Sequence, residues 1–586
     1  MKNRHEFLSL LIPYRKKIFF AFIAILITNL SGLVFPWSIK IIIDDVLVPK
    51  NVLLLNTLAI GLVFVFILKA GSGYLCEYLI SWVGENAVCD LRNRILWHLQ
   101  RLSVKYIENT STGKIISSVI GDVESIKKLL FGGALDFIYS FFNVIFVLTI
   151  LLIMDWRLTL VSLIFLPAFG FTFFKLTPRL QEKHREVRDK YAELTSGINE
   201  VFNGIRIITG FAKNEYEAAR LNARQKEIVK ASLYSHRLAI ALWTGSEFIS
   251  SLGLVTLLWF GSRAVFSGGI SAGGLVAFYS YLGMLFSPVI KMVIINNYYQ
   301  EAAASLRRIN EILSEEPKVQ EAGHPVSLHR IKGNIEFRGV SFSYDNNKEV
   351  LSEIDLEAGE SEVIALVGKS GAGKTTLINL LLRFYDPGKG AIFIDGHNLK
   401  TLDLRTYRSR MAMVLQDDYL FSASIRENIL YSKSDADETE VIQAAQLANA
   451  HQFILELPRG YDTGIGERGV KLSYGQRQRI SIARAILRSP AILILDEATS
   501  CVDSETERLI IEGAYKNVIR GRTTFIIAHR LSAITYADKI VFIEDGRIAE
   551  TGSHFQLLEK RGRYWRMWRQ QAGSTDYDFQ ASKALT

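Results

Sequence analysis

Six long apolar segments in the first half of the chain constrain its fold more than any other feature. They cover residues 18–37, 58–80, 135–154, 158–176, 242–265 and 275–295. Each approaches the ~20 apolar residues that a helix needs to cross about 30 Å of hydrocarbon. Only Asp155, Trp156 and Arg157 separate the third segment from the fourth, so these two should form a tight hairpin. The sequence therefore predicts an all-α transmembrane domain of six helices over residues 1–314.

The basic residues indicate how these segments are oriented. Lysines and arginines gather at one set of segment ends, and the opposite set carries little beyond Lys50, Arg157 and Arg263. Because cytoplasmic loops carry an excess of basic residues, both termini and both long loops are predicted to be cytosolic. We expect a multi-pass protein of the cytoplasmic membrane. The net charge of +9 follows from this topology, and no basic patch interleaved with aromatics indicates nucleic acid as a partner.

The second half has the composition of a soluble α/β domain. We place a polar linker at residues 315–332, the domain at 333–572 and a polar, disordered tail at 573–586. Short β-branched runs such as VIALVG and AILILD alternate with helical patterns, which predicts parallel strands joined by crossover helices. The three cysteines lie far apart, which argues against a disulfide framework or a structural zinc site.

A phosphate-binding loop lies in this domain. VIALVGKSGAGKTT fits the pattern G-x-x-x-x-G-K-[ST] through Gly368, Gly373, Lys374 and Thr375, between a predicted strand and a predicted helix. Glycines let the backbone approach phosphates, and the N–H groups at the helix start hold them. Lys374 would neutralise β/γ-phosphate charge and the Thr375 hydroxyl would ligate Mg²⁺. The predicted ligands are therefore ATP and Mg²⁺.

A second acidic motif supports ATP hydrolysis. AILILDEATS is an apolar strand that ends in Asp496 and Glu497. One carboxylate at such a strand end can hold Mg²⁺ through water, and its neighbour can orient the attacking water.

The soluble half resembles the nucleotide-binding domain of ATP-binding-cassette (ABC) transporters. KLSYGQRQRISIARAIL resembles the signature sequence of that family, and FSY places Tyr344 where the family stacks an aromatic ring on adenine. VLQDDYLF supplies Gln416, similar to the glutamine of the coupling loop, and IIAHRL supplies His529, similar to the histidine that contacts the γ-phosphate. GERG and SCVD match two further family segments.

The resemblance implies a set of site residues. The implied catalytic residues are Glu497, His529, Lys374 and Gln416. The implied Mg²⁺ ligands are Thr375, Gln416 and Asp496. The implied ATP contacts are Tyr344, Gly368, Lys369, Ser370, Gly371, Ala372, Gly373, Lys374, Thr375, Thr376, Gln416, Ser473, Gly475 and Gln476.

In the family, two such domains stack head to tail, so that the signature of one closes over the ATP of the other. The Ser473 hydroxyl and the Gly475 N–H can donate to a γ-phosphate, and a helix that starts near Gln476 points its positive end there. We therefore expect a homodimer. The chain departs from the family at Tyr474, where glycine is usual, and at Cys501 and Val502. Since tyrosine cannot adopt positive φ without strain, we expect a shifted signature loop or slower turnover, and a heterodimer stays open.

The first half resembles the six-helix membrane domain of exporter-type half-transporters, such as lipid A flippases and multidrug exporters. YIENTSTGKIISSVIGDVESI and GIRIITGFAKNEYEAA resemble the segments that carry the two coupling helices of the family. Both domains lie in one chain, which favours export. The expected function is ATP-driven export of a hydrophobic or amphipathic substrate, a lipid or drug, by alternating access. Export of a mature small peptide and a nucleotide-gated channel or regulatory subunit are the alternatives.

Charged residues inside the predicted spans bear on that substrate. Each costs about 2.5–3.5 kcal/mol at a helix centre on insertion scales, so it should face a polar cavity or a partner. One alternative is that these side chains, Glu77 among them, form ion pairs with one another or extend their charged ends to the membrane interface. The other is a substrate cavity in which the lysines bind an anionic headgroup. The candidate cavity residues are Lys40, Lys69, Asp136, Glu247 and Lys291.

Overall fold

The computed structural model describes residues 11–344, 348–415, 419–466, 469–496, 516–528, 534 and 537–572. The chain divides into two compact units. The first contains Met1–Arg101 and Asn109–Glu316, and the second contains Leu102–Glu108 and Pro317–Thr586. Each unit is described by itself below.

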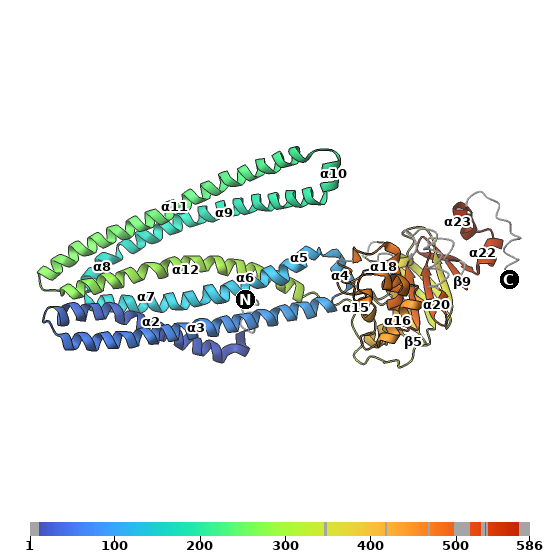
Figure 1. Cartoon of the computed structure of the whole chain (residues 1–586), viewed down its shortest axis with the longest axis horizontal. Helices are drawn as coiled ribbons and strands as arrows, with labels where there is room; N and C mark the ends of the chain where they lie inside the picture. The colour runs from blue at the N-terminus through green and yellow to red at the C-terminus, as the bar shows by residue number, and fades with distance from the viewer. Residues whose placement is uncertain are drawn as a thin grey trace. The chain divides into compact units, whose positions relative to one another are not determined.

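Long helices make up the first unit (Figure 1). They are α2 (Arg15–Ile41), α3 (Val52–Arg101), α7 (Ala134–Met154), α9 (Phe165–Asn203), α11 (Asn214–Phe266) and α12 (Ala272–Leu313). The shorter helical elements are η1 (Ile12–Tyr14), η2 (Ile42–Leu47), α5 (Thr112–Ser117), η3 (Ser118–Asp122), α6 (Val123–Lys128), η4 (Leu129–Gly133), α8 (Trp156–Leu163) and α10 (Ile205–Gly210). The short helix α4 (Val104–Asn109) crosses the division between the units.

The long helices pack in pairs. Helix α2 lies along α3, α7 lies along α12, and α9 lies along α11, with α10 at the turn of that last pair (Figure 1). Between α7 and α8 the backbone turns at Asp155, whose Oδ1 accepts hydrogen bonds from the N–H groups of Arg157 and Leu158 at 2.8 and 3.0 Å. An N-cap carboxylate satisfies helix N–H groups that otherwise have no partner. This confirms the predicted tight turn after the third apolar segment.

The apolar segments coincide with helices. Four helical stretches among the described residues are long and apolar enough to cross a membrane, and a shorter apolar helix covers Ala272–Leu285. The four stretches are Ile12–Leu47, Val52–Arg101, Thr112–Met154 and Asn214–Phe266. The predicted segments 18–37, 58–80, 135–154 and 242–265 lie inside them, and 275–295 begins in the shorter helix. Segment 158–176 covers α8 and the start of α9, where several side chains lie outside the description.

Two sheets form the second unit. The six-stranded sheet has the order β10-β9-β3-β8-β7-β6, in which the five strands from β9 to β6 are parallel and β10 is antiparallel to β9. Its strands are β3 (Val363–Val367), β6 (Met411–Val414), β7 (Ile492–Asp496), β8 (Thr523–Ile527), β9 (Lys539–Glu544) and β10 (Arg547–Gly552). The antiparallel four-stranded sheet consists of β2 (Leu351–Ala358), β1 (Ile335–Phe342), β4 (Lys389–Ile394) and β5 (His397–Asn398). The predicted parallel strands are confirmed.

Strand β3 is buried along its whole length because it contributes to two cores. Val363, Ala365 and Val367 pack on one face, whereas Ile364 and Leu366 pack on the other. A parallel strand that is covered on both faces is apolar throughout, which explains the run VIALV.

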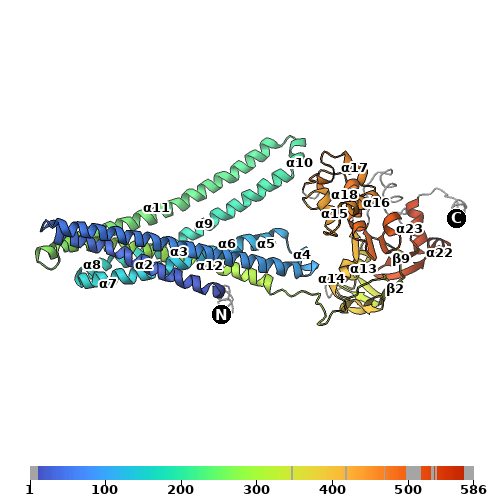
Figure 2. The ribbon, with the colours of Figure 1, turned by 60° about the horizontal axis from the view of Figure 1, so that its bottom comes forward.

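The second unit also contains several helices. They are α13 (Lys374–Leu381), α14 (Leu404–Ser409), α15 (Ile425–Leu430), α16 (Glu438–Leu447), α17 (His451–Glu456), α18 (Tyr474–Leu487), α20 (Lys516–Ile519), α22 (His554–Glu559) and α23 (Arg563–Ala572), with η5 (Leu399–Thr401) and η6 (Gly460–Asp462). Figure 2 shows α15, α16, α17 and α18 gathered at one side of this unit. The loop after β3 leads directly into α13.

Candidate functional site

The glycines of the loop between β3 and α13 have backbone conformations that favour glycine. Gly368, Gly371 and Gly373 have φ angles of +153°, +81° and +107°. A Cβ atom on Gly368 would lie 2.2 Å from the Ile543 carbonyl oxygen, and one on Gly373 would lie 2.6 Å from Leu351 Cδ2. Glycine at these positions therefore lets the loop keep this conformation close to β9 and β2, as in a phosphate-binding loop.

Lys374 is the first residue of α13, and its ammonium group lies inside this loop. The residue is only 5% exposed, and Nζ donates to the carbonyl oxygens of Gly368 at 2.8 Å and Lys369 at 3.0 Å. Burial lowers the pKa of Lys374, and the Asp496 carboxylate acts in the opposite direction. The loop thus holds a buried cation at the positive end of a helix, which suits a polyphosphate.

Asp496 ends β7 and faces the same site. Burial raises the pKa of its carboxyl group, and Lys374 acts in the opposite direction. Thr375 is exposed, so its hydroxyl group is accessible next to the buried lysine. A hydroxyl and a carboxylate are oxygen ligands of the kind that Mg²⁺ takes together with substrate phosphates. The residues present therefore fit a magnesium ion.

Tyr344 is fixed by the same helix. Its hydroxyl lies 3.1 Å from Thr376 Oγ1 and accepts a hydrogen bond from Asn379 Nδ2 at 3.3 Å. Its ring meets Phe342 and Tyr385 edge to face, with centroids 5.0 and 5.1 Å apart. The structure thus holds this half-buried aromatic ring next to the phosphate-binding loop.

The signature motif lies at the start of α18. Ser473 is the N-cap: its Oγ accepts from the Gln476 N–H at 3.2 Å, while Gln476 Oε1 accepts from the Ser473 N–H at 3.0 Å. This capping box leaves the Ser473 hydroxyl hydrogen available for another acceptor. The helix begins at Tyr474, two residues before the predicted start near Gln476.

The expected strain at Tyr474 is wrong. Tyr474 is the first residue of α18 and is absent from the described non-glycine residues with positive φ. A helical residue has φ near −63°, which tyrosine adopts without steric strain. The Arg477 guanidinium lies 5.8 Å from the centroid of the Tyr474 ring.

Several predicted site residues fall outside the description. Gln416, Glu497 and His529 are among them, as are Cys501 and Val502. Their roles therefore stay predictions.

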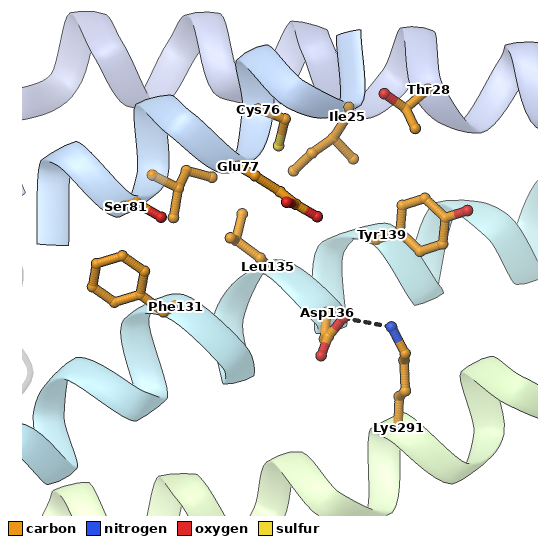
Figure 3. Close-up of a pocket in the computed structure, with 12 residues that line it drawn as sticks. Ile25, Thr28, Cys76, Glu77, Ser81, Phe131, Leu135, Asp136, Tyr139 and Lys291 are labelled. Carbon is orange, nitrogen blue, oxygen red and sulfur yellow. Dashed lines mark hydrogen bonds and ion pairs between the residues drawn. The ribbon is translucent and has the colours of Figure 1, made fainter. Parts of the chain in front are cut away.

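The first unit brings some of the charged span residues together and separates others. Lys291 Nζ lies 2.6 Å from Asp136 Oδ1, across α12 and α7. Both line a pocket of about 510 Å³ together with Glu77 of α3 (Figure 3). This pair corresponds to the ion-pair alternative. The sequence identifies Glu77 only as a charge within a predicted span. It does not indicate that Glu77 lines this pocket, because it does not show which helix faces α3.

Lys40, Lys69 and Glu247 do not line that pocket. Lys40 Nζ lies 4.8 Å from the centroid of the Trp37 ring, the Lys69 side chain packs against Gly32 of α2, and Glu247 is exposed on α11.

An ion pair between buried Asp122 of η3 and half-exposed Arg308 of α12 had no signal in the sequence. Asp122 is 6% exposed and accepts hydrogen bonds from Arg308 Nε at 3.0 Å and from Ser305 Oγ at 3.0 Å. The partners are more than 180 positions apart. Only the packing of the helices brings them together.

Comparisons with known proteins agree along nearly the whole chain. Residues 18–289 match the family model described as the ABC transporter transmembrane region, and residues 351–500 match the model described as ABC transporter. The chain is 35% identical to the putative multidrug export ATP-binding/permease protein YgaD of Bacillus subtilis (strain 168), over 96% of this chain and 98% of that protein. It is 34% identical to the ATP-dependent lipid A-core flippase of Syntrophus aciditrophicus (strain SB), over 96% of this chain and 93% of that protein.

A solved structure of a bacterial Atm1-family ABC exporter with ATP bound also matches. The TM-score is 0.78 at 28% sequence identity, and the match covers 96% of this chain and 99% of that one. The likeness thus extends through both units.

Proposed function

This chain belongs to the ABC transporter family, and on that premise we propose that it works as a homodimeric exporter of a lipid or drug in the cytoplasmic membrane. It is a membrane-spanning exporter whose ATPase domain binds ATP and couples its hydrolysis to transport. The names of the relatives, a multidrug exporter and a lipid A-core flippase, support an amphipathic or hydrophobic substrate. The ATPase domain and both termini are proposed to be cytosolic.

The proposed roles in ATP hydrolysis combine the geometry of the phosphate-binding loop with the roles that the resemblance to the family implies. Lys374 and the N–H groups of the loop bind and orient the phosphates, and Tyr344 holds the adenine. The Ser473 hydroxyl and the Gly475 N–H of the partner subunit donate to the γ-phosphate, so a complete site needs two chains. Glu497 orients the attacking water and His529 contacts the γ-phosphate.

Mg²⁺ would be held by Thr375, Asp496 and Gln416. When bound, it neutralises the charge that develops on the transferring phosphoryl group.

Coupling to the membrane is proposed to run through two segments of the first half. They are residues 106–126, which include α5 and η3, and residues 204–219, which include α10. Closure of paired ATPase domains on ATP would favour one orientation of the helices, and hydrolysis would release it. Alternating access of this kind needs two states with different ATP affinity.

The observation that carries the ATPase assignment is the Lys374 ammonium, buried inside a glycine loop beside Asp496. Lys374→Ala should lose ATP binding, because the loop then lacks its only buried cation among the described residues. We expect ATP hydrolysis in phospholipid vesicles to fall at least about 100-fold, which corresponds to about 2.7 kcal/mol.

Lys389→Ala is the control, since Lys389 is an exposed lysine at the start of β4. It should bind and hydrolyse ATP as the unmodified chain does. Unchanged ATP binding by Lys374→Ala would contradict the phosphate-binding role.

A further inference from the structure

The pocket in the first unit has the size and lining of a ligand site. Its volume is about 510 Å³, within the range of about 300–1,000 Å³ that is usual for small-molecule sites. The walls come from α2, α3, η4, α7 and α12 (Figure 3). Apolar side chains such as Ile25, Ile80 and Leu135 alternate with polar ones such as Thr28 and Ser81.

An aromatic ring forms one wall of this pocket. The Phe131 ring lies directly on Gly84 of α3, where an added Cβ atom would come within 1.7 Å of the ring. Gly84 is buried, so the ring packs directly against the backbone of α3. Phe131 therefore presents an aromatic surface to the pocket.

The charges in the pocket do not balance. Lys291 is already neutralised by Asp136 at 2.6 Å, which leaves Glu77 as the remaining charge among the residues that line it. Within the described part of the chain, the Glu77 carboxylate has no hydrogen bond or ion pair. Figure 3 shows it reaching from α3 toward α7. The lining residues therefore carry a net negative charge. Because a charge inside a membrane span is costly unless it has a partner, a positively charged ligand would stabilise Glu77.

A positive group has further favourable contacts in this pocket. The Tyr139 ring already lies 5.8 Å from the Lys291 ammonium, a distance at which aromatic rings attract cations. Phe131 offers a second ring. By contrast, an anionic headgroup would have to compete with Asp136 for Lys291 and would meet Glu77.

We propose that this pocket binds the cationic group of an amphipathic substrate, with the Glu77 carboxylate as its counter-charge and with Phe131 and Tyr139 against its apolar part. This assignment rests on the proposed export function and narrows its substrate class from amphipathic compounds to cationic ones.

The test is a binding measurement with two probes that match in shape and differ in charge. Tetraphenylphosphonium and tetraphenylborate have the same four phenyl groups around a cationic or an anionic centre. Binding to the full chain is measured in phosphatidylcholine nanodiscs without nucleotide, and ATP hydrolysis is measured separately on the same sample. We expect tetraphenylphosphonium to bind at least about tenfold more tightly than tetraphenylborate, a difference of about 1.4 kcal/mol.

Charge variants separate the role of Glu77 from general attraction of cations. Glu77→Gln should weaken tetraphenylphosphonium binding about tenfold. Lys291→Gln leaves Asp136 unpaired and should strengthen tetraphenylphosphonium binding. This second variant keeps the inference testable if Glu77→Gln does not fold. Glu193→Gln is the matched control, because Glu193 is an exposed carboxylate on α9 that lies outside the proposed coupling segments and does not line the pocket.

Equal binding of both probes, or unchanged tetraphenylphosphonium affinity in both pocket variants, would overturn the inference. If ATP hydrolysis is normal in that case, the proposed export function still stands. Cation binding in a chain that cannot hydrolyse ATP would support the pocket and count against the proposed function.

Discussion

Single residues in the phosphate-binding loop differ in why they must be glycine. Gly371 has φ of +81°, yet an added Cβ atom would meet nothing within 4 Å. Gly368 has φ of +153° and faces the Ile543 carbonyl oxygen at 2.2 Å from such a Cβ. Alanine at position 371 would introduce only conformational strain. Alanine at position 368 would in addition force two backbone segments apart.

This difference gives a prediction for the two alanine variants. A left-handed conformation costs a residue with a side chain about 1–2 kcal/mol, so Gly371→Ala should weaken ATP binding by roughly tenfold. Gly368→Ala adds a clash with backbone that cannot rotate away, and should abolish measurable binding. Titration with a fluorescent ATP analogue would decide. Equal affinities in the two variants would show that the loop does not have this geometry when it binds ATP.

At the scale of elements, a half-buried histidine links the two C-terminal helices. His554 begins α22, and its Nδ1 lies 2.8 Å from the hydroxyl of Tyr564 on α23. Tyr564 is 0% exposed, and the His554 ring also meets Trp568 at 6.2 Å. Burial lowers the pKa of His554 from its usual 6.5. The folded helices therefore favour the neutral imidazole.

A pH dependence follows from that shift. Below pH 6.5 the unfolded chain binds a proton that the folded chain resists, so the contribution of His554 to stability is present above pH 6.5 and is lost as the pH falls toward its lowered folded pKa. Between pH 7.5 and pH 5, the melting temperature of His554→Gln should fall less than that of the unmodified chain. Parallel pH curves for the two proteins would contradict this.

Helices and strands were predictable wherever a short stretch of sequence is enough to indicate them. The apolar runs located the membrane helices, and VIALV located a strand buried on both faces. The pairing of Asp136 with Lys291, and of Asp122 with Arg308, was not predictable, because each pair joins helices more than 150 positions apart. Which face of one helix meets another depends on packing along their whole length. The strain expected at Tyr474 was wrong because a family pattern of glycines does not reveal the local φ.

At the scale of the whole molecule, the ATP site should be complete only between two chains. We expect Ser473 of one chain to approach Ser370 in the loop of its partner when nucleotide is bound. A chain that carries Ser370→Cys and Ser473→Cys, with Cys76, Cys89 and Cys501 replaced by serine, tests this. Cα atoms must come within about 7 Å for a disulfide to form without backbone movement, so cross-linking reports close approach.

With a non-hydrolysable ATP analogue and a mild oxidant, this variant should run as a covalent dimer on a denaturing gel. Either cysteine substitution alone should give a monomer, because neither chain then supplies the second thiol at the seam. Nucleotide is needed because its phosphates would bridge the Lys374 loop of one chain and the N-terminus of the signature helix of its partner. Dimer bands of equal intensity with and without nucleotide would mean that ATP does not close the interface. A monomer under all conditions would remove the shared site on which the proposed coupling to the membrane depends.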